Sequence, residues 1–97
     1  MGDFYKIRKL GEDVNRLMKT ANMEYDSNNF SNIDKHKELL VNYKSRLCNC
    51  SSGYDTVAAV EKAVAIEKCN GLKSKIKIIK QLLSRMENSN GINENAV

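Results

Sequence analysis

The sequence predicts an all-α fold, a small antiparallel helical bundle of three or four helices. Apolar residues recur at steps of three and four along most of the chain, which is the period of an amphipathic α-helix. The 97 residues include no proline, a residue that interrupts helices and is common in turns. The alternation typical of a strand is confined to residues 73–79, so a β-rich fold is disfavoured.

The first predicted helix covers about residues 4–27, and Asp3 is suited to cap its start. Its apolar stripe consists of Ile7, Leu10, Val14, Leu17 and Ala21, widened by Phe4, Met18 and Tyr25. A stripe of this width suits the core of a bundle better than a narrow coiled-coil seam does. The turn-forming residues 26–29 predict the end of the helix.

The second predicted helix covers about residues 32–50. Ser31 and Asp34 resemble a weak capping box at its start. Its apolar stripe consists of Ile33, His36, Leu40, Tyr43, Leu47 and Cys50. The steps of three and four again predict one buried face, and the Ser-Ser-Gly sequence of residues 51–53 predicts a clear break after it.

The third helical stretch covers about residues 54–88, with Ser52 or Asp55 as its candidate cap. Residues 57–66 are small and apolar on most faces, so they are predicted to form the most buried helix of the bundle. Further along the chain the apolar residues narrow to one stripe, which consists of Leu72, Ile76, Ile79, Leu83 and Met86.

Asn70 and Gly71 divide this stretch and leave two architectures open. A glycine just past a helix end can take the left-handed conformation that closes the helix, which would give four helices. Otherwise the helix continues as one long arm of roughly 50 Å, at about 1.5 Å per residue, in a three-helix protein. Residues 88–97 are polar, so they are predicted to form a flexible tail behind a single domain of residues 1–87.

The charge and the cysteine content indicate which binding partners and which cellular compartment to expect. The net charge of +4 permits contact with nucleic acid, anionic lipid or an acidic protein without requiring any of them. The N-terminus is charged where a secretory signal has its apolar core, and no apolar run approaches the ~20 residues of a membrane span. An odd number of cysteines, three, favours reduced, free thiols. We therefore expect an intracellular protein, cytoplasmic or nuclear.

The sequence shows no catalytic motif and no phosphate-binding glycine loop. His36 is the only histidine, and its place on an apolar stripe favours a structural role. Together with Cys48, Cys50 and Cys69 it makes four candidate zinc ligands, but their spacing is poor for a structural zinc site. A disulfide from Cys48 or Cys50 to Cys69 is the alternative to reduced thiols. We expect no enzyme activity, no cofactor, no metal site and no small-molecule substrate.

The most one-sided charge lies between Glu67 and Glu87, where the charged residues are Lys68, Lys73, Lys75, Lys77, Lys80 and Arg85. Lys73, Lys77 and Lys80 follow at helical spacing and predict an exposed ridge on the side opposite the apolar stripe. A solvated surface, a phosphate site, a site for anionic lipid and a site for an acidic protein all fit this pattern.

These observations predict a non-enzymatic protein-interaction module: an adaptor, complex subunit or inhibitor that presents a helix face to a protein partner. Self-association is a further option, because a chain of this length buries a marginal core. The predicted partner-binding residues are Lys73, Lys75, Lys77, Lys80 and Arg85, with Tyr43 and Tyr54 as aromatics at the rim. The alternative is a nucleic-acid-binding regulator that uses the same basic face, and docking on an anionic membrane surface ranks below it. The residues support no resemblance to a known family.

Overall fold

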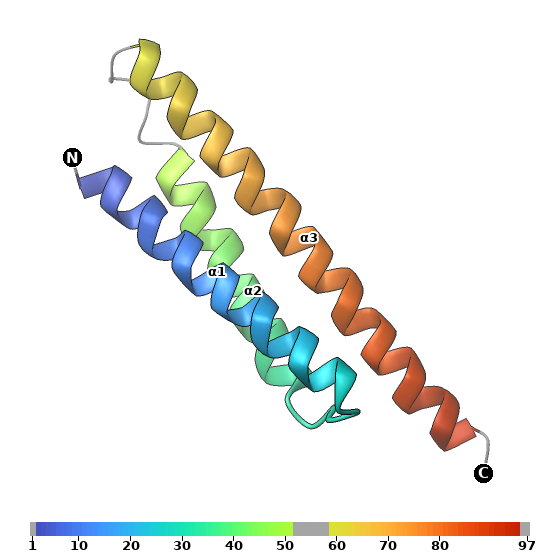
Figure 1. The fold of residues 1–97 in the computed structure, drawn as a ribbon. Helices are drawn as coiled ribbons and strands as arrows, with labels where there is room; N and C mark the ends of the chain where they lie inside the picture. The colour runs from blue at the N-terminus through green and yellow to red at the C-terminus, as the bar shows by residue number, and fades with distance from the viewer. Residues whose placement is uncertain (1, 52–58, 96–97) are drawn as a thin grey trace.

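The described residues form three α-helices that lie side by side. The computed structural model describes residues 2–51 and 59–95. Helix α1 spans Gly2–Asp26, α2 spans Ile33–Ser51 and α3 spans Ala59–Asn95. Successive helices run in opposite directions, and the molecule is a rod of 59 × 18 × 17 Å (Figure 1). The predicted all-α antiparallel bundle is confirmed.

Each helix contributes one apolar stripe to a single core. Every pair of helices is in contact, so the three stripes meet along the axis of the bundle. The central residues of the α1 stripe, from Ile7 to Ala21, are buried as predicted, and so are the stripe of α2 and the stripe of α3 beyond Gly71. Tyr25, which was predicted to widen the α1 stripe, is exposed. The largest fully buried side chains are Leu10, Val14, Ile79, Leu83 and Met86. Full burial of such a side chain contributes about 1.5–3 kcal/mol, so these stripes are the main source of stability.

α1 ends in a tight turn, within residues 26–29 as predicted. Asn28 has a φ of 56°, in the left-handed region that asparagine tolerates better than most residues. The Asn29 N–H donates to the Glu24 carbonyl at 2.9 Å, and the Asn28 N–H donates to the Tyr25 carbonyl at 3.2 Å. These two hydrogen bonds form a Schellman motif, which satisfies carbonyl groups that the helix end leaves open.

A buried polar pair, Glu24 and His36, connects this end of α1 to α2. His36 Nε2 lies 3.1 Å and 2.9 Å from the two carboxylate oxygens of Glu24. Asn32 Nδ2 donates to Glu24 Oε1 at 3.1 Å. Glu24 and His36 are both buried, so each removes part of the cost of desolvating the other. The contact fits the structural role that the sequence predicts for His36.

α3 is one continuous helix of 37 residues, roughly 55 Å long at about 1.5 Å per residue. Gly71 has no positive φ, so the four-helix alternative with a left-handed cap at residues 70–71 is wrong. A continuous helix keeps the backbone hydrogen bonds that a break at this position would lose. The helix also passes its predicted end near Glu87 and reaches Asn95, whereas the flexibility of residues 88–97 stays a prediction. The candidate caps Ser52 and Asp55 lie outside the described residues.

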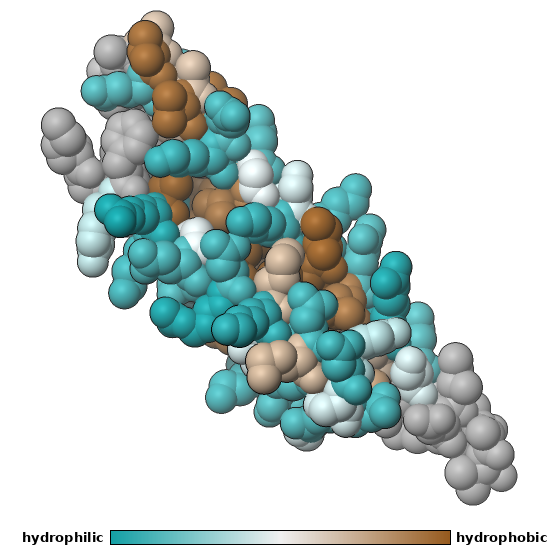
Figure 2. Space-filling model, in the orientation of Figure 1, coloured by the Kyte–Doolittle hydropathy of each residue, from teal (hydrophilic) through white to brown (hydrophobic). Residues whose placement is uncertain are grey.

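The start of α3 is exposed, which corrects the prediction that residues 57–66 form the most buried helix. Within the described part of this segment Ala65 is buried, but Val60, Val64 and Ile66 are 77%, 40% and 48% exposed. The reason is the unequal length of the helices, because the first turns of α3 extend beyond the ends of α1 and α2 (Figure 1). Figure 2 shows hydrophobic side chains on the surface at this end of the molecule.

Replacing Gly71 with alanine tests the continuous helix. A Cβ atom at Gly71 would meet no atom within 4 Å, so Gly71→Ala adds helix propensity without a clash. We expect the free energy of unfolding in urea to rise by up to about 1 kcal/mol. Gly11→Ala is a matched control, because its Cβ would lie 3.7 Å from Leu72 Cδ2 in ordinary contact, and it should also stabilise. A loss of stability confined to Gly71→Ala would instead indicate a left-handed cap.

Replacing His36 or Glu24 tests the buried pair. His36→Leu leaves the Glu24 carboxylate without its principal donor, and Glu24→Leu leaves the imidazole without its acceptor. We expect each single change to lower the free energy of unfolding by about 1–3 kcal/mol. The double variant should lose less than the sum of the two, because it removes both polar groups together. Strictly additive losses in urea titrations would contradict the energetic coupling of the pair.

Candidate functional site

A basic trough lies between α2 and α3. One hollow of about 480 Å³ is lined by Lys44, Leu47, Cys48, Lys73, Ile76, Lys77 and Lys80. A second hollow of about 300 Å³ is lined by Lys37, Leu40, Val41, Lys44, Lys80, Leu83, Ser84 and Glu87. Because the two hollows share Lys44 and Lys80, they adjoin along the same pair of helices. We refer to the two together as the α2–α3 trough.

The buried stripes of the two helices explain why lysines line the trough. On α3, Lys77 and Lys80 each directly follow a residue of the buried stripe, Ile76 and Ile79. A step of one residue turns a helix by about 100°, which carries these side chains from the core to the flank. On α2, Lys37 and Lys44 stand seven residues apart, and each likewise follows a buried stripe residue. The packing of the stripes therefore brings a row of cations from each helix to the same trough.

Most of the positive charge in the trough has no acidic neighbour. Lys44, Lys73, Lys77 and Lys80 are exposed. Within the described residues none of these four lysines forms an ion pair. Of the side chains that line the trough, Glu87 is the acidic one, and it pairs with Lys37 across the end of the trough. The trough therefore holds a concentrated positive potential that attracts anionic groups.

Two of the predicted site residues lie on the other side of α3. Lys75 donates to Asn15 Oδ1 of α1 at 2.7 Å. Arg85 lines a small hollow of about 160 Å³ that also includes Met18 and Asn22 of α1. The predicted set of basic partner-binding residues is therefore divided, because Lys75 and Arg85 lie beside α1. The predicted ridge of Lys73, Lys77 and Lys80 stays together, but it flanks the apolar stripe next to α2 and does not lie opposite the stripe as predicted.

One of the two aromatic candidates, Tyr43, lies in the core and not at the predicted rim. Tyr43 is 7% exposed and belongs to the core, because it lies on the buried stripe of α2 between Leu40 and Leu47. Its ring also lies under the Arg46 guanidinium, with Cζ 5.7 Å from the ring centroid. Its prediction as a surface anchor is therefore wrong. Tyr54 lies outside the described residues.

Sequence reasoning missed Lys37 and Lys44. Their spacing of seven residues places them on one face of a helix, beside the apolar stripe, and that signal is present in the sequence. What the sequence does not show is that this flank of α2 faces Lys73, Lys77 and Lys80. That juxtaposition depends on how the two helices pack.

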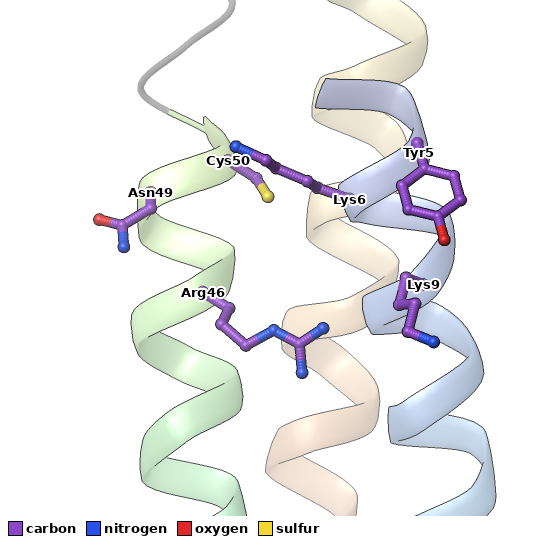
Figure 3. Close-up of a pocket in the computed structure, with 6 residues that line it drawn as sticks. All are labelled: Tyr5, Lys6, Lys9, Arg46, Asn49 and Cys50. Carbon is purple, nitrogen blue, oxygen red and sulfur yellow. The ribbon is translucent and has the colours of Figure 1, made fainter. Parts of the chain in front are cut away.

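A third basic hollow lies between the N-terminal part of α1 and the C-terminal part of α2. Its volume is about 360 Å³, and it is lined by Tyr5, Lys6, Lys9, Arg46, Asn49 and Cys50. Figure 3 shows Lys6 reaching towards α2, whereas Tyr5 and Lys9 point to the outer side of α1. Arg46 also donates to Asp13 Oδ2 at 3.0 Å, and Asp13 Oδ1 lies 3.7 Å from Arg16 Nη1. Because part of its charge is neutralised and its cations diverge, this hollow is a weaker candidate than the α2–α3 trough.

The thiols and the histidine do not form one site, although Cys50 and Cys69 lie near each other in the core. The three cysteines form no disulfide, and Cys48 is exposed while Cys50 and Cys69 are buried. Burial raises the pKa of the Cys69 thiol, and the nearby Cys50 adds to the shift while Lys73 opposes it. Across residues 2–51 and 59–95 no three His, Cys, Asp or Glu side chains are grouped as metal ligands would be. In the same part of the chain, no helix combines the length and the apolar character that a membrane crossing requires.

No family model matches the chain, and no similar protein was found among curated proteins or solved structures. The function is therefore inferred from the chemistry of the α2–α3 trough.

The pKa of Tyr43 makes stability depend on pH. Burial raises this pKa above the usual 10.0, and the Asp13 carboxylate adds to the rise while Arg46 and Arg16 oppose it. A raised pKa means that the fold favours the neutral phenol. The resulting stabilisation is complete below pH 10 and is lost as the pH rises through the pKa of the folded state.

We expect Tyr43→Phe to reduce the decline in unfolding free energy that urea titrations record between pH 9 and about pH 11. Tyr5→Phe is the matched control, because Tyr5 is exposed and its replacement should leave the decline unchanged. Identical alkaline declines for the wild type and Tyr43→Phe would show that the Tyr43 phenol does not contribute.

Proposed function

We propose that the protein is a non-enzymatic protein-interaction module, an adaptor, complex subunit or inhibitor that presents its α2–α3 face to an acidic protein partner. One observation carries the proposal. Four exposed lysines, Lys44, Lys73, Lys77 and Lys80, surround one trough, and within the described residues none of them forms an ion pair. Like charges this close repel one another, and the carboxylates of a partner would relieve that repulsion.

The apolar content of the trough supports a protein partner over a purely ionic one. Of the apolar residues that line the trough, Val41 is 69% exposed, whereas Leu40, Leu47, Ile76 and Leu83 are buried at its base. The methylene stems of lysine side chains also cover apolar surface while their ammonium groups stay in water. A partner that combines acidic and apolar side chains would use both features, whereas a free anion would use one.

The nucleic-acid alternative has weaker support. Lys75 faces α1, so the four lysines assigned to phosphates, Lys73, Lys75, Lys77 and Lys80, do not form one surface. The described residues that line the trough include no aromatic side chain on which an unpaired base could stack. Enzyme activity has no candidate either, because the sequence carries no catalytic motif and the described His36 and Glu24 form a buried pair.

Affinity purification with charge-reversed bait tests this function. The test variant is Lys77→Glu with Lys80→Glu, which reverses charge inside the trough. The control is Lys19→Glu with Lys35→Glu, which changes the net charge equally at two exposed positions outside the trough. We expect the wild type and the control to retain the same acidic protein, and the test variant to lose it. With the purified partner, the test variant should bind at least tenfold more weakly, about 1.4 kcal/mol.

Two outcomes would overturn the proposal. Equal retention of the purified partner by the wild type, the test variant and the control would show that the trough is not used. Loss of capture after nuclease treatment of the lysate, together with a steep salt dependence of oligonucleotide binding, would favour the nucleic-acid regulator instead.

A further inference from the structure

The cations line both edges of the α2–α3 trough. Lys37 and Lys44 belong to the edge formed by α2, and Lys73, Lys77 and Lys80 belong to the edge formed by α3. The apolar side chains Leu40, Leu47, Ile76 and Leu83 belong to the same two helices and line the trough with them. A ligand that fits this pattern carries negative charge on both flanks of a narrow apolar stripe.

The trough has the length of a short helix. Its lining residues extend over residues 37–48 of α2 and over residues 73–87 of α3. At about 1.5 Å per residue these segments measure roughly 16 Å and 21 Å. That length corresponds to roughly three to four turns of an α-helix. The Lys37–Glu87 ion pair marks one end of the trough.

The walls of the trough favour a helical ligand over an extended one. Both walls are α-helices, so their backbone N–H and C=O groups are already bonded within each helix. An extended peptide would therefore find no strand edge with which to pair, and its own backbone would stay unsatisfied where it is buried. A helix satisfies its backbone internally and needs only side-chain contacts.

Resting on the proposed function, we infer that the partner supplies an acidic amphipathic α-helix of three to four turns, which lies in the α2–α3 trough as the fourth helix of a bundle. Glutamate or aspartate side chains on both flanks of this helix meet Lys44 on one side and Lys73, Lys77 and Lys80 on the other. A narrow apolar stripe between these flanks contacts Val41 and the apolar lining of the trough. The apolar contact is small, because Leu40, Leu47, Ile76 and Leu83 are already buried. Charge complementarity therefore dominates recognition.

A second copy of the chain does not fit the trough equally well. The chain has a net charge of +4, and the exposed flanks of α3 that adjoin its apolar stripe are lysine-rich. Two copies meeting through this face would bring like charges together, which is destabilising. The occupant is therefore a different, acidic chain.

Synthetic peptides test the inference directly. The probe is a fluorescent 16-residue peptide, designed as a helix with an alanine and leucine stripe flanked by glutamates on both sides. A scrambled peptide of identical composition keeps the net charge but disperses the stripe and the flanks. A single-stranded oligonucleotide of equal charge serves as the nucleic-acid probe. Binding to the full chain is followed by fluorescence anisotropy, and peptide helicity by circular dichroism.

We expect the helical peptide to bind at least tenfold more tightly than the scrambled peptide and to gain helicity on binding. Lys77→Glu with Lys80→Glu should weaken binding at least tenfold, and Lys19→Glu with Lys35→Glu should change it less than twofold. Val41→Ala should weaken binding of the helical peptide but not of the scrambled one. All substituted residues are exposed, and circular dichroism of each variant checks that the bundle stays folded.

Equal binding of the helical and scrambled peptides would overturn the inference, because it would reduce recognition to net charge. Preferential binding of the oligonucleotide through Lys77 and Lys80 would overturn it too. If neither peptide binds but the purified partner still depends on Lys77 and Lys80, the helical ligand is wrong and the proposed function stands. If the partner also ignores these lysines, both proposals fail.

Discussion

The burial of the α3 stripe between α1 and α2 is the constraint on which the other features depend. Ile76, Ile79 and Leu83 are almost completely enclosed by the two other helices, and this fixes the rotation of α3 about its own axis. Once that rotation is set, Lys77 and Lys80 turn towards α2, and Lys75 turns towards Asn15 of α1. The buried apolar residues of α3 therefore determine where its lysines lie, because the two flanks of a helix rotate together.

The α1–α2 and α2–α3 interfaces differ in their polar contacts. Between α1 and α2, polar contacts occur at Asp13–Arg46 and at Glu24–His36. Between α2 and α3, the described ion pair is Lys37–Glu87, at one end. Lysines of both helices line the rest of that face, and the apolar side chains below them belong to the core. Carboxylates of the proposed partner could form charge-assisted hydrogen bonds with Lys44, Lys73, Lys77 and Lys80, which form no ion pair with other described residues.

The sequence was sufficient for features that depend on one helix at a time. The buried stripes, the turn at residues 26–29 and the exposure of Lys73, Lys77 and Lys80 all follow from local periodicity or turn chemistry. Features that depend on two helices were missed or wrong. Lys44 joins the trough because α2 faces α3, and Val60, Val64 and Ile66 are exposed because the first turns of α3 extend past the ends of α1 and α2 (Figure 1). Tyr43 is buried as its place on the α2 stripe indicates, so its assignment to the rim was wrong. At Gly71 the sequence permits either a cap or a continuous helix, and the structure has a continuous helix.

The unequal lengths of the helices also divide the molecule by local stability. The first turns of α3 extend beyond the ends of α1 and α2 (Figure 1), and of residues 59–66 only Ala65 is buried. Unwinding these first turns exposes little additional apolar surface, so their amide protons exchange with solvent through local opening. We expect the amides of residues 72–86 to exchange only when the whole bundle unfolds, because this segment carries the buried stripe of α3. Although α3 is a single helix, its burial therefore predicts two segments of different local stability.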